Sequence, residues 1–169
     1  MSIGIDYHLG VLSNRMNAEL FTTFTYTAYA RAYANEREGN KIAEIQNTNS
    51  NEYTDVLIDT SVAGISFMIV DDEIEPLSQL DFIAKVDIYF AVNLKVLYSS
   101  VLERDAHEYL HRDVGEVLND SEFDITKIVT GREAFKDFDY IKEGDNLEPF
   151  YLVKFETEIT YELKENIKC

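Results

Sequence analysis

The clearest alternation of apolar and polar positions lies between Asp81 and Leu118. From Phe82 to Val92 every second residue is apolar. A period of two is typical of a β-strand with one buried face, and a strand of this length spans about 36 Å at roughly 3.3 Å per residue. In residues 105–118 the apolar positions instead follow a helical period, at Ala106, Leu110, Val114, Val117 and Leu118. We therefore predict a long strand followed by an amphipathic helix.

A second long strand is predicted at residues 150–163. Its apolar positions alternate with a polar row made of Lys154, Glu156, Glu158 and Glu162. We expect this row to face solvent or a channel, because an outward row of charges resists edge-to-edge aggregation of strands.

The remaining segments give weaker patterns. We predict an extended segment at 1–12, a helix from Ser13 to about residue 24, strands at 25–34, 56–58, 63–70 and 125–129, a solvated turn at 71–76, and a charged loop at 132–146. Residues 35–52 are rich in asparagine and read as an excursion from the core, with a short strand at 42–45. The order of elements predicts an α+β fold with a mainly antiparallel sheet and a helix packed on one face.

Length and charge narrow the classes of function. The 169 residues predict a single domain, 1–169, with an arm or insertion at 35–52 and a loose C-terminal tail at 164–169. A formal net charge of −17 disfavours nucleic-acid binding through a basic surface. Cys169 is the single cysteine, which excludes an intrachain disulfide. We see no signal peptide and no apolar run of about 20 residues, and expect a soluble protein made in a cytoplasm, without a membrane partner.

One short motif suggests chemistry. Residues 107–111 read His-Glu-Tyr-Leu-His, which matches the H-E-x-x-H pattern of zinc proteases. On a helix, His107 and His111 would share one face and bind Zn²⁺, while Glu108 would act as general base on a bound water. A third ligand is required: Glu133, 22 residues beyond His111, is the candidate, and Glu122 and Asp124 lie nearer in the sequence. This gives an alternative hypothesis of a small zinc-dependent hydrolase.

The surroundings of the motif favour a structural role. Charged Arg112 and Asp113 follow His111 directly, whereas this position is normally uncharged in such proteases, and the residues around Glu133 predict a turn rather than a second helix. The simpler interpretation is two surface histidines on the polar flank of a helix, with Glu108 and Arg112 as an i,i+4 ion pair. On this interpretation the protein has no catalytic residue, no metal and no cofactor.

Three segments carry a resemblance to a known class of proteins. They are Tyr29-Ala-Arg-Ala-Tyr-Ala-Asn-Glu-Arg37 with Gly39-Asn-Lys41, Val86-Asp-Ile-Tyr-Phe-Ala-Val-Asn-Leu94 before Leu97-Tyr98, and residues 104–114, which close with His111-Arg-Asp-Val114. Together they resemble the neck and tail-completion (tail-terminator-like) proteins of tailed bacteriophages, and are similar to ring proteins of crAss-like phages.

The resemblance implies a tail-terminator-like fold and a non-enzymatic virion protein. Such a protein would form a homo-oligomeric ring between portal and tail, with other phage neck, portal or tail proteins as partners. Genomic DNA would pass through the ring without tight binding, and the acidic surplus would line or surround that passage. Glu156, Glu158 and Glu162 are the candidate lumen residues.

Overall fold

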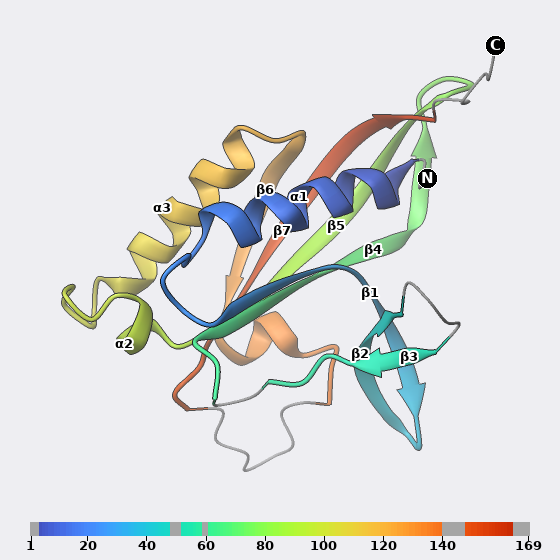
Figure 1. The fold of residues 1–169 in the computed structure, drawn as a ribbon. Helices are drawn as coiled ribbons and strands as arrows, with labels where there is room; N and C mark the ends of the chain where they lie inside the picture. Colours follow the sequence, from blue (N-terminus) through green and yellow to red (C-terminus); the bar gives the residue numbers. More distant parts are fainter. Residues whose placement is uncertain (1–3, 48–51, 59–60, 140–147, 164–169) are drawn as a thin grey trace.

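The computed structural model describes residues 4–47, 52–58, 61–139 and 148–163. Within them, seven strands form one sheet in the order β3-β2-β1-β4-β5-β7-β6 (Figure 1). The strands are β1 (Tyr26–Arg37), β2 (Asn40–Gln46), β3 (Tyr53–Asp55), β4 (Gly64–Pro76), β5 (Asp81–Val92), β6 (Phe123–Thr130) and β7 (Tyr151–Glu162). Strands β1 and β4 pair parallel, and all other neighbours pair antiparallel. The predicted α+β class with a mainly antiparallel sheet is confirmed.

Helices cover the two faces of the sheet unequally. The long helices α1 (Ile5–Glu19) and α3 (Ala106–Asn119) lie on one face (Figure 1), and the 3-10 helix η1 (Gly131–Phe135) packs on part of the other. The short helix α2 (Leu94–Leu97) follows β5 directly. One face is therefore a full helix-covered core, and the other is covered at one end only.

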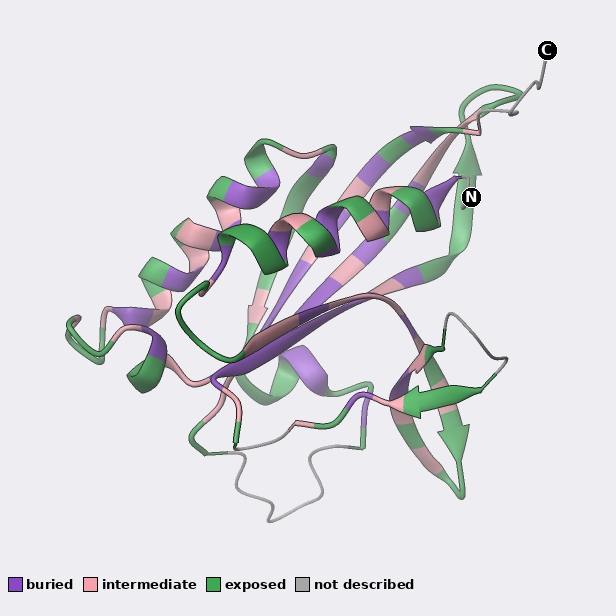
Figure 2. Ribbon diagram, viewed as in Figure 1, coloured by how far each residue is buried: buried purple, intermediate pink, exposed green. Residues whose placement is uncertain are grey.

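The predicted alternation in β5 decides which side chains enter each core. Ala84, Val86, Ile88 and Phe90 are fully buried under the helices, which confirms the pattern seen in the sequence. Tyr89, on the opposite face, packs with Phe67, Phe135 and Phe138 below η1. Figure 2 shows the buried stretches of β5 and β7 running beneath the helices.

Two predicted boundaries are wrong for identifiable reasons. The helix begins at Ile5 rather than Ser13, and buries Leu9, Leu12 and Met16 on one face. Gly10 made this segment look extended, but packing of an apolar face outweighs the helix penalty of one glycine, about 1 kcal/mol. The segment 71–76 is not a turn: β4 continues through it to Pro76, because β5 supplies hydrogen-bonding partners there.

The predicted arm at 35–52 is partly a β-hairpin. Residues up to Arg37 belong to β1 and residues 40–46 form β2, longer than the predicted strand at 42–45. The strand predicted at 56–58 is wrong, since the structure places β3 at Tyr53–Asp55 just before it. Residues 48–51 and the predicted tail at 164–169 lie outside the described residues, so the tail stays a prediction.

The sheet divides along the β1–β4 boundary. These strands pair only from Tyr26 opposite Gly64 to Ala32 opposite Ile69, with a bulge between Ala28 and Arg31. Side chains of α1 hold this bulge, since Ser13 Oγ donates to Ala28 O at 2.7 Å and Ala28 N donates to Asn17 Oδ1 at 2.8 Å. Beyond it β1 turns toward β2, and β4 continues toward its hairpin with β5 (Figure 1).

Candidate functional site: an acidic groove on the open sheet face

The half-open face of the sheet carries a groove of about 820 Å³. It lies where β1 and β4 separate, and extends across β5 and β7 to the turn after η1. Its lining includes six carboxylates and three basic side chains: Asp71, Asp72, Asp87, Asp137, Glu156 and Glu158, with Arg31, Lys41 and Lys85. The groove is thus a concave surface on which carboxylates outnumber basic side chains.

A buried lysine organises the neighbouring carboxylates. Lys154 is only 8% exposed, and its Nζ contacts Asp87 Oδ2 at 2.9 Å and Glu156 Oε1 at 3.0 Å. Burial alone would lower the pKa of Lys154, but its hydrogen bonds to Asp87 and Glu156 outweigh burial and raise that pKa. The ammonium group therefore stays charged and neutralises part of the groove.

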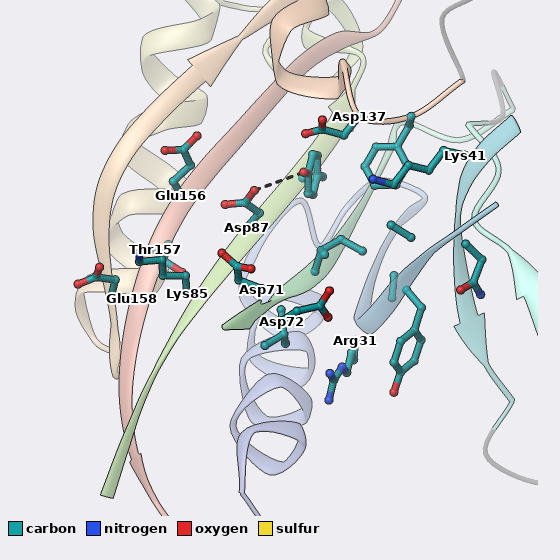
Figure 3. Close-up of a pocket in the computed structure, with 18 of the residues that line it drawn as sticks. Arg31, Lys41, Asp71, Asp72, Lys85, Asp87, Asp137, Glu156, Thr157 and Glu158 are labelled. Atoms are coloured by element: carbon teal, nitrogen blue, oxygen red, sulfur yellow. Dashed lines mark hydrogen bonds between the residues drawn. The ribbon is translucent and has the colours of Figure 1, made fainter. Parts of the chain in front are cut away.

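Tyr89, two residues after Asp87 on the same face of β5, belongs to the same network. Its hydroxyl donates to Asp87 Oδ2 at 3.4 Å, the hydrogen bond drawn in Figure 3. Burial and the nearby Asp87 carboxylate raise the pKa of Tyr89, so its hydroxyl keeps its proton. The Lys154 ammonium also lies 5.7 Å from the centre of the Tyr89 ring. Asp87 is consequently held in place by two donors.

The outer carboxylates of the groove lack such a cation. In Figure 3 Glu158 of β7 lies next to Lys85, the residue opposite it on β5, and Asp71 and Asp72 of β4 lie on the other side of Lys85. None of the three carboxylates forms an ion pair with another residue that the structure describes. Strands β4 and β7 bring these carboxylates to one surface, and such a surface repels polyanions and attracts cations.

The predicted polar row of β7 is confirmed only in part. Glu156 and Glu158 line the groove and are half-buried, and Glu162 is exposed beyond it. Lys154 was expected in the same outward row but is buried, because Asp87 from β5 and Glu156 enclose its ammonium group.

The structure places the candidate zinc ligands on two different faces of the sheet. His107 and His111 are neighbours on α3, with ring centres 5.9 Å apart, and both contact Tyr151 of β7. Glu133 lies on η1, where it binds Lys136 Nζ at 2.6 Å. Among the described residues no group of three or more His, Cys, Asp or Glu side chains is arranged to hold a metal ion.

The side chains around the motif differ from the predicted arrangement. His111 is half-buried against the Phe155 ring, and burial, with the nearby His107, lowers its pKa, so it is not simply a solvated histidine. Arg112 pairs with Asp113 at 2.6 Å and Glu116 at 3.9 Å, and the predicted pair with Glu108 is wrong. Glu108 is exposed. The two nearer carboxylates satisfy the guanidinium group instead.

Sequence reasoning missed the central pair of the groove, Asp87 and Lys154. Each stands at a mixed position of a long alternating strand, where a charge reads as solvent-facing. Their contact depends on the register, which sets Asp87 opposite Glu156 and Tyr89 opposite Lys154. The two long alternating patterns of β5 and β7 were the available signal, but they do not by themselves reveal which residues lie opposite each other.

Two comparisons of the sequence with known proteins, a scan against protein-family models and a search of curated proteins, give no match. Of the helices in the described part of the chain, none has the length and apolar character required to cross a membrane.

Proposed function

We propose that this chain is a structural, non-enzymatic subunit of an oligomeric ring in the neck or tail of a tailed bacteriophage. The resemblance of three segments to tail-completion proteins motivates the proposal. The single structural observation that supports it is the acidic groove, which crosses the sheet face that the long helices leave open. The partners would be further copies of the chain and other neck, portal or tail proteins, within the virion.

The groove suits a passage for DNA rather than a binding site for it. DNA carries about one negative charge per 1.7 Å of its axis, so proteins that grip it present Lys and Arg to the phosphates. Here six carboxylates surround three basic side chains. A ring with this face inward would repel the duplex from its wall and let it slide. In such a ring Glu156 and Glu158, two of the three candidate lumen residues, would face the opening, whereas Glu162 lies outside the groove.

The first experiment measures assembly and shape. Native mass spectrometry of the purified chain should give one closed oligomer, and electron microscopy should show rings with a central opening. A protein that stays monomeric at micromolar concentration, alone and with neck or tail partners, would contradict the proposal.

The second experiment tests which face lines the opening. The double variant Asp137→Lys with Glu158→Lys reverses two charges in the groove, and should make the ring retain short duplex DNA in an electrophoretic assay. Glu108→Lys with Glu116→Lys makes the same change of charge on α3, on the opposite face, and serves as the matched control. Equal retention by both variants would show that the groove is not the inner surface.

The zinc-hydrolase alternative is tested on the same material. The structure brings His107 and His111 together without Glu133. Stoichiometric zinc in the purified protein, lost in His111→Ala, would favour the hydrolase and count against a purely structural role.

A further inference from the structure

Among the described residues, strand edges without a partner occur at β3, at the end of β1 beyond Ala32, at β6 and at β4, and the last two lie at opposite ends of the run β4-β5-β7-β6. One is the outer edge of β6, which pairs only with β7. The other is the far half of β4: its pairing with β1 ends at Ile69, while β4 itself continues to Pro76. Unpaired edges present backbone donors and acceptors that a second strand can satisfy. On the β4 edge, Glu73 N already donates to Asp71 Oδ1, and Pro76 has no N–H.

The two edges lie at the same level of the sheet. Ile74 of β4 is opposite Ala84 of β5, Ala84 is opposite Ile159 of β7, and Ile159 is opposite Phe123 of β6. One row of residues therefore crosses the four strands from one free edge to the other. Without a shift along the strand direction, two copies placed side by side would bring residues 70–74 of β4 beside residues 123–125 of β6, a short segment.

The strand directions also agree. Each neighbour in the run β4-β5-β7-β6 is antiparallel to the next, so β4 and β6 point in opposite directions. If β6 of one copy lies beside β4 of another, the new pair is antiparallel as well. The alternation of the sheet then continues across the contact.

The two edges differ in charge: β4 is acidic, whereas β6 with η1 has as many basic as acidic side chains. The β4 edge carries four carboxylates and no basic residue, at Asp71, Asp72, Glu73 and Glu75. Strand β6 and η1 carry two basic and two acidic side chains, at Lys127, Arg132, Asp124 and Glu133. Each edge also exposes large apolar side chains: Ile74 on β4 is 42% exposed, and Ile125 and Ile128 on β6 are each 39% exposed.

We infer that the β4 edge, residues 71–76, of one copy pairs with the β6 edge of a second copy. This contact joins two different surfaces, so it repeats from copy to copy and closes into a ring when the rotation allows. Symmetric pairing of two β4 edges is disfavoured, since it would set four carboxylates against four others. The inference rests on the proposed ring and specifies which surfaces form it.

Irregularities in both strands limit pairing to a short segment. The β4 register shifts between Val70 and Ile74, and that of β6 between Ile125 and Lys127. In β6 the bulged Thr126 donates its Oγ1 to Glu156 O at 3.0 Å. Bulges protect an edge from indiscriminate pairing, so a partner must match their positions. A second copy of the same chain offers the edge whose level and direction match.

Cross-linking tests the contact directly. In a Cys169→Ser background, Ile74→Cys combined with Ile125→Cys and treated with a short bismaleimide should give a ladder of covalent oligomers up to the ring size. Leu57→Cys combined with Ile125→Cys is the matched control, because Leu57 is exposed and apolar but lies on neither edge. Each single variant should remain largely uncross-linked.

A charge reversal gives a second readout. Lys127→Glu should lower the assembled fraction at least fivefold at a concentration where the unaltered protein is half assembled. Lys95→Glu on α2 is the control, since Lys127 and Lys95 have similar side-chain exposure, 64% and 68%. The addition of Glu73→Lys to Lys127→Glu should recover assembly in part.

The outcomes separate the inference from the proposed function. If the unaltered protein forms rings but the ladder is absent, or Lys127→Glu behaves like Lys95→Glu, the β4–β6 contact is wrong and the ring stands. If Ile125→Cys alone gives efficient covalent dimers, β6 pairs with itself and the inference is overturned. A protein that never assembles overturns the ring and the contact together.

Discussion

Replacement of Lys154 by methionine is the sharpest test of the groove. Methionine keeps most of the apolar length of the side chain and removes only the ammonium group. Asp87 and Glu156 would then face each other without the cation that each contacts within 3.0 Å. We expect the loss of this cation, rather than the loss of packing, to dominate the effect.

The structure sets the size of the effect. Removing one partner of a fully buried ion pair costs about 3–5 kcal/mol, because the remaining charge is left buried. The carboxylates here keep side-chain exposures of 32% and 30%, so water replaces part of the lost interaction. We therefore expect the free energy of unfolding to fall by about 2–3 kcal/mol, which lowers Tm by roughly 4–12 °C for a chain of this length.

Urea denaturation followed by circular dichroism measures this change. Lys136→Met is the matched control, since Lys136 forms an exposed pair with Glu133, and it should leave stability unchanged. Adding Asp87→Asn and Glu156→Gln to Lys154→Met removes the unpaired charges and should restore at least about 1 kcal/mol. If Lys154→Met were no less stable than Lys136→Met, the buried network would not have the role assigned to it.

Three further predictions concern stability elsewhere in the fold. Burial lowers the pKa of His111, so the unfolded chain binds a proton there more readily than the folded chain, and stability falls as pH drops below about 6.5. His111→Gln should therefore lose less stability between pH 7 and 5.5 than the unaltered protein. An unchanged dependence of the free energy of unfolding on pH would contradict this. Gly64→Ala should cost about 1–3 kcal/mol because its Cβ would lie 2.6 Å from Val92 Cγ1, whereas Gly10→Ala in α1 meets no atom within 4 Å and should gain about 0.5–1 kcal/mol by urea titration. Phe135→Ala should cost about 3–5 kcal/mol, since the ring is fully buried; a cost below about 1 kcal/mol would mean that η1 does not seal its end of the sheet.

Strong periodicity made the central elements predictable. The alternation in β5 and β7 and the helical pattern of α3 depend on one buried face each, so residue spacing alone identifies them. The acidic end of β4 was unpredictable for a physical reason. Its residues have poor β-propensity, and they become a strand only because β5 pairs with them.

The candidate site was predictable in its composition but not in its geometry. The sequence indicated that Glu156 and Glu158 share a face of a strand, and the structure places both in the groove. The burial of Lys154 was not predictable from the sequence. It depends on Asp87 of β5, and the sequence pattern does not show that the strand register brings Asp87 next to Lys154. For the zinc motif, the positions of the two histidines were predictable but a third ligand was not. Spacing along one helix correctly placed His107 beside His111, but a third ligand depends on contacts between distant elements.

The two faces of the sheet differ in composition, and this difference explains how such an acidic chain can fold. The face under α1 and α3 buries a continuous apolar core, so it supplies most of the stability. That leaves the opposite face free to carry carboxylates, whose mutual repulsion would otherwise oppose packing of the strands. Lys154 reduces this repulsion at the floor of the groove, where Asp87 and Glu156 come closest to the core. Of the outer carboxylates, Asp71 and Asp72 are exposed and Glu158 is half-buried. Stability and surface repulsion are therefore separable, and variants of the outer carboxylates should change DNA retention while leaving the free energy of unfolding nearly unchanged.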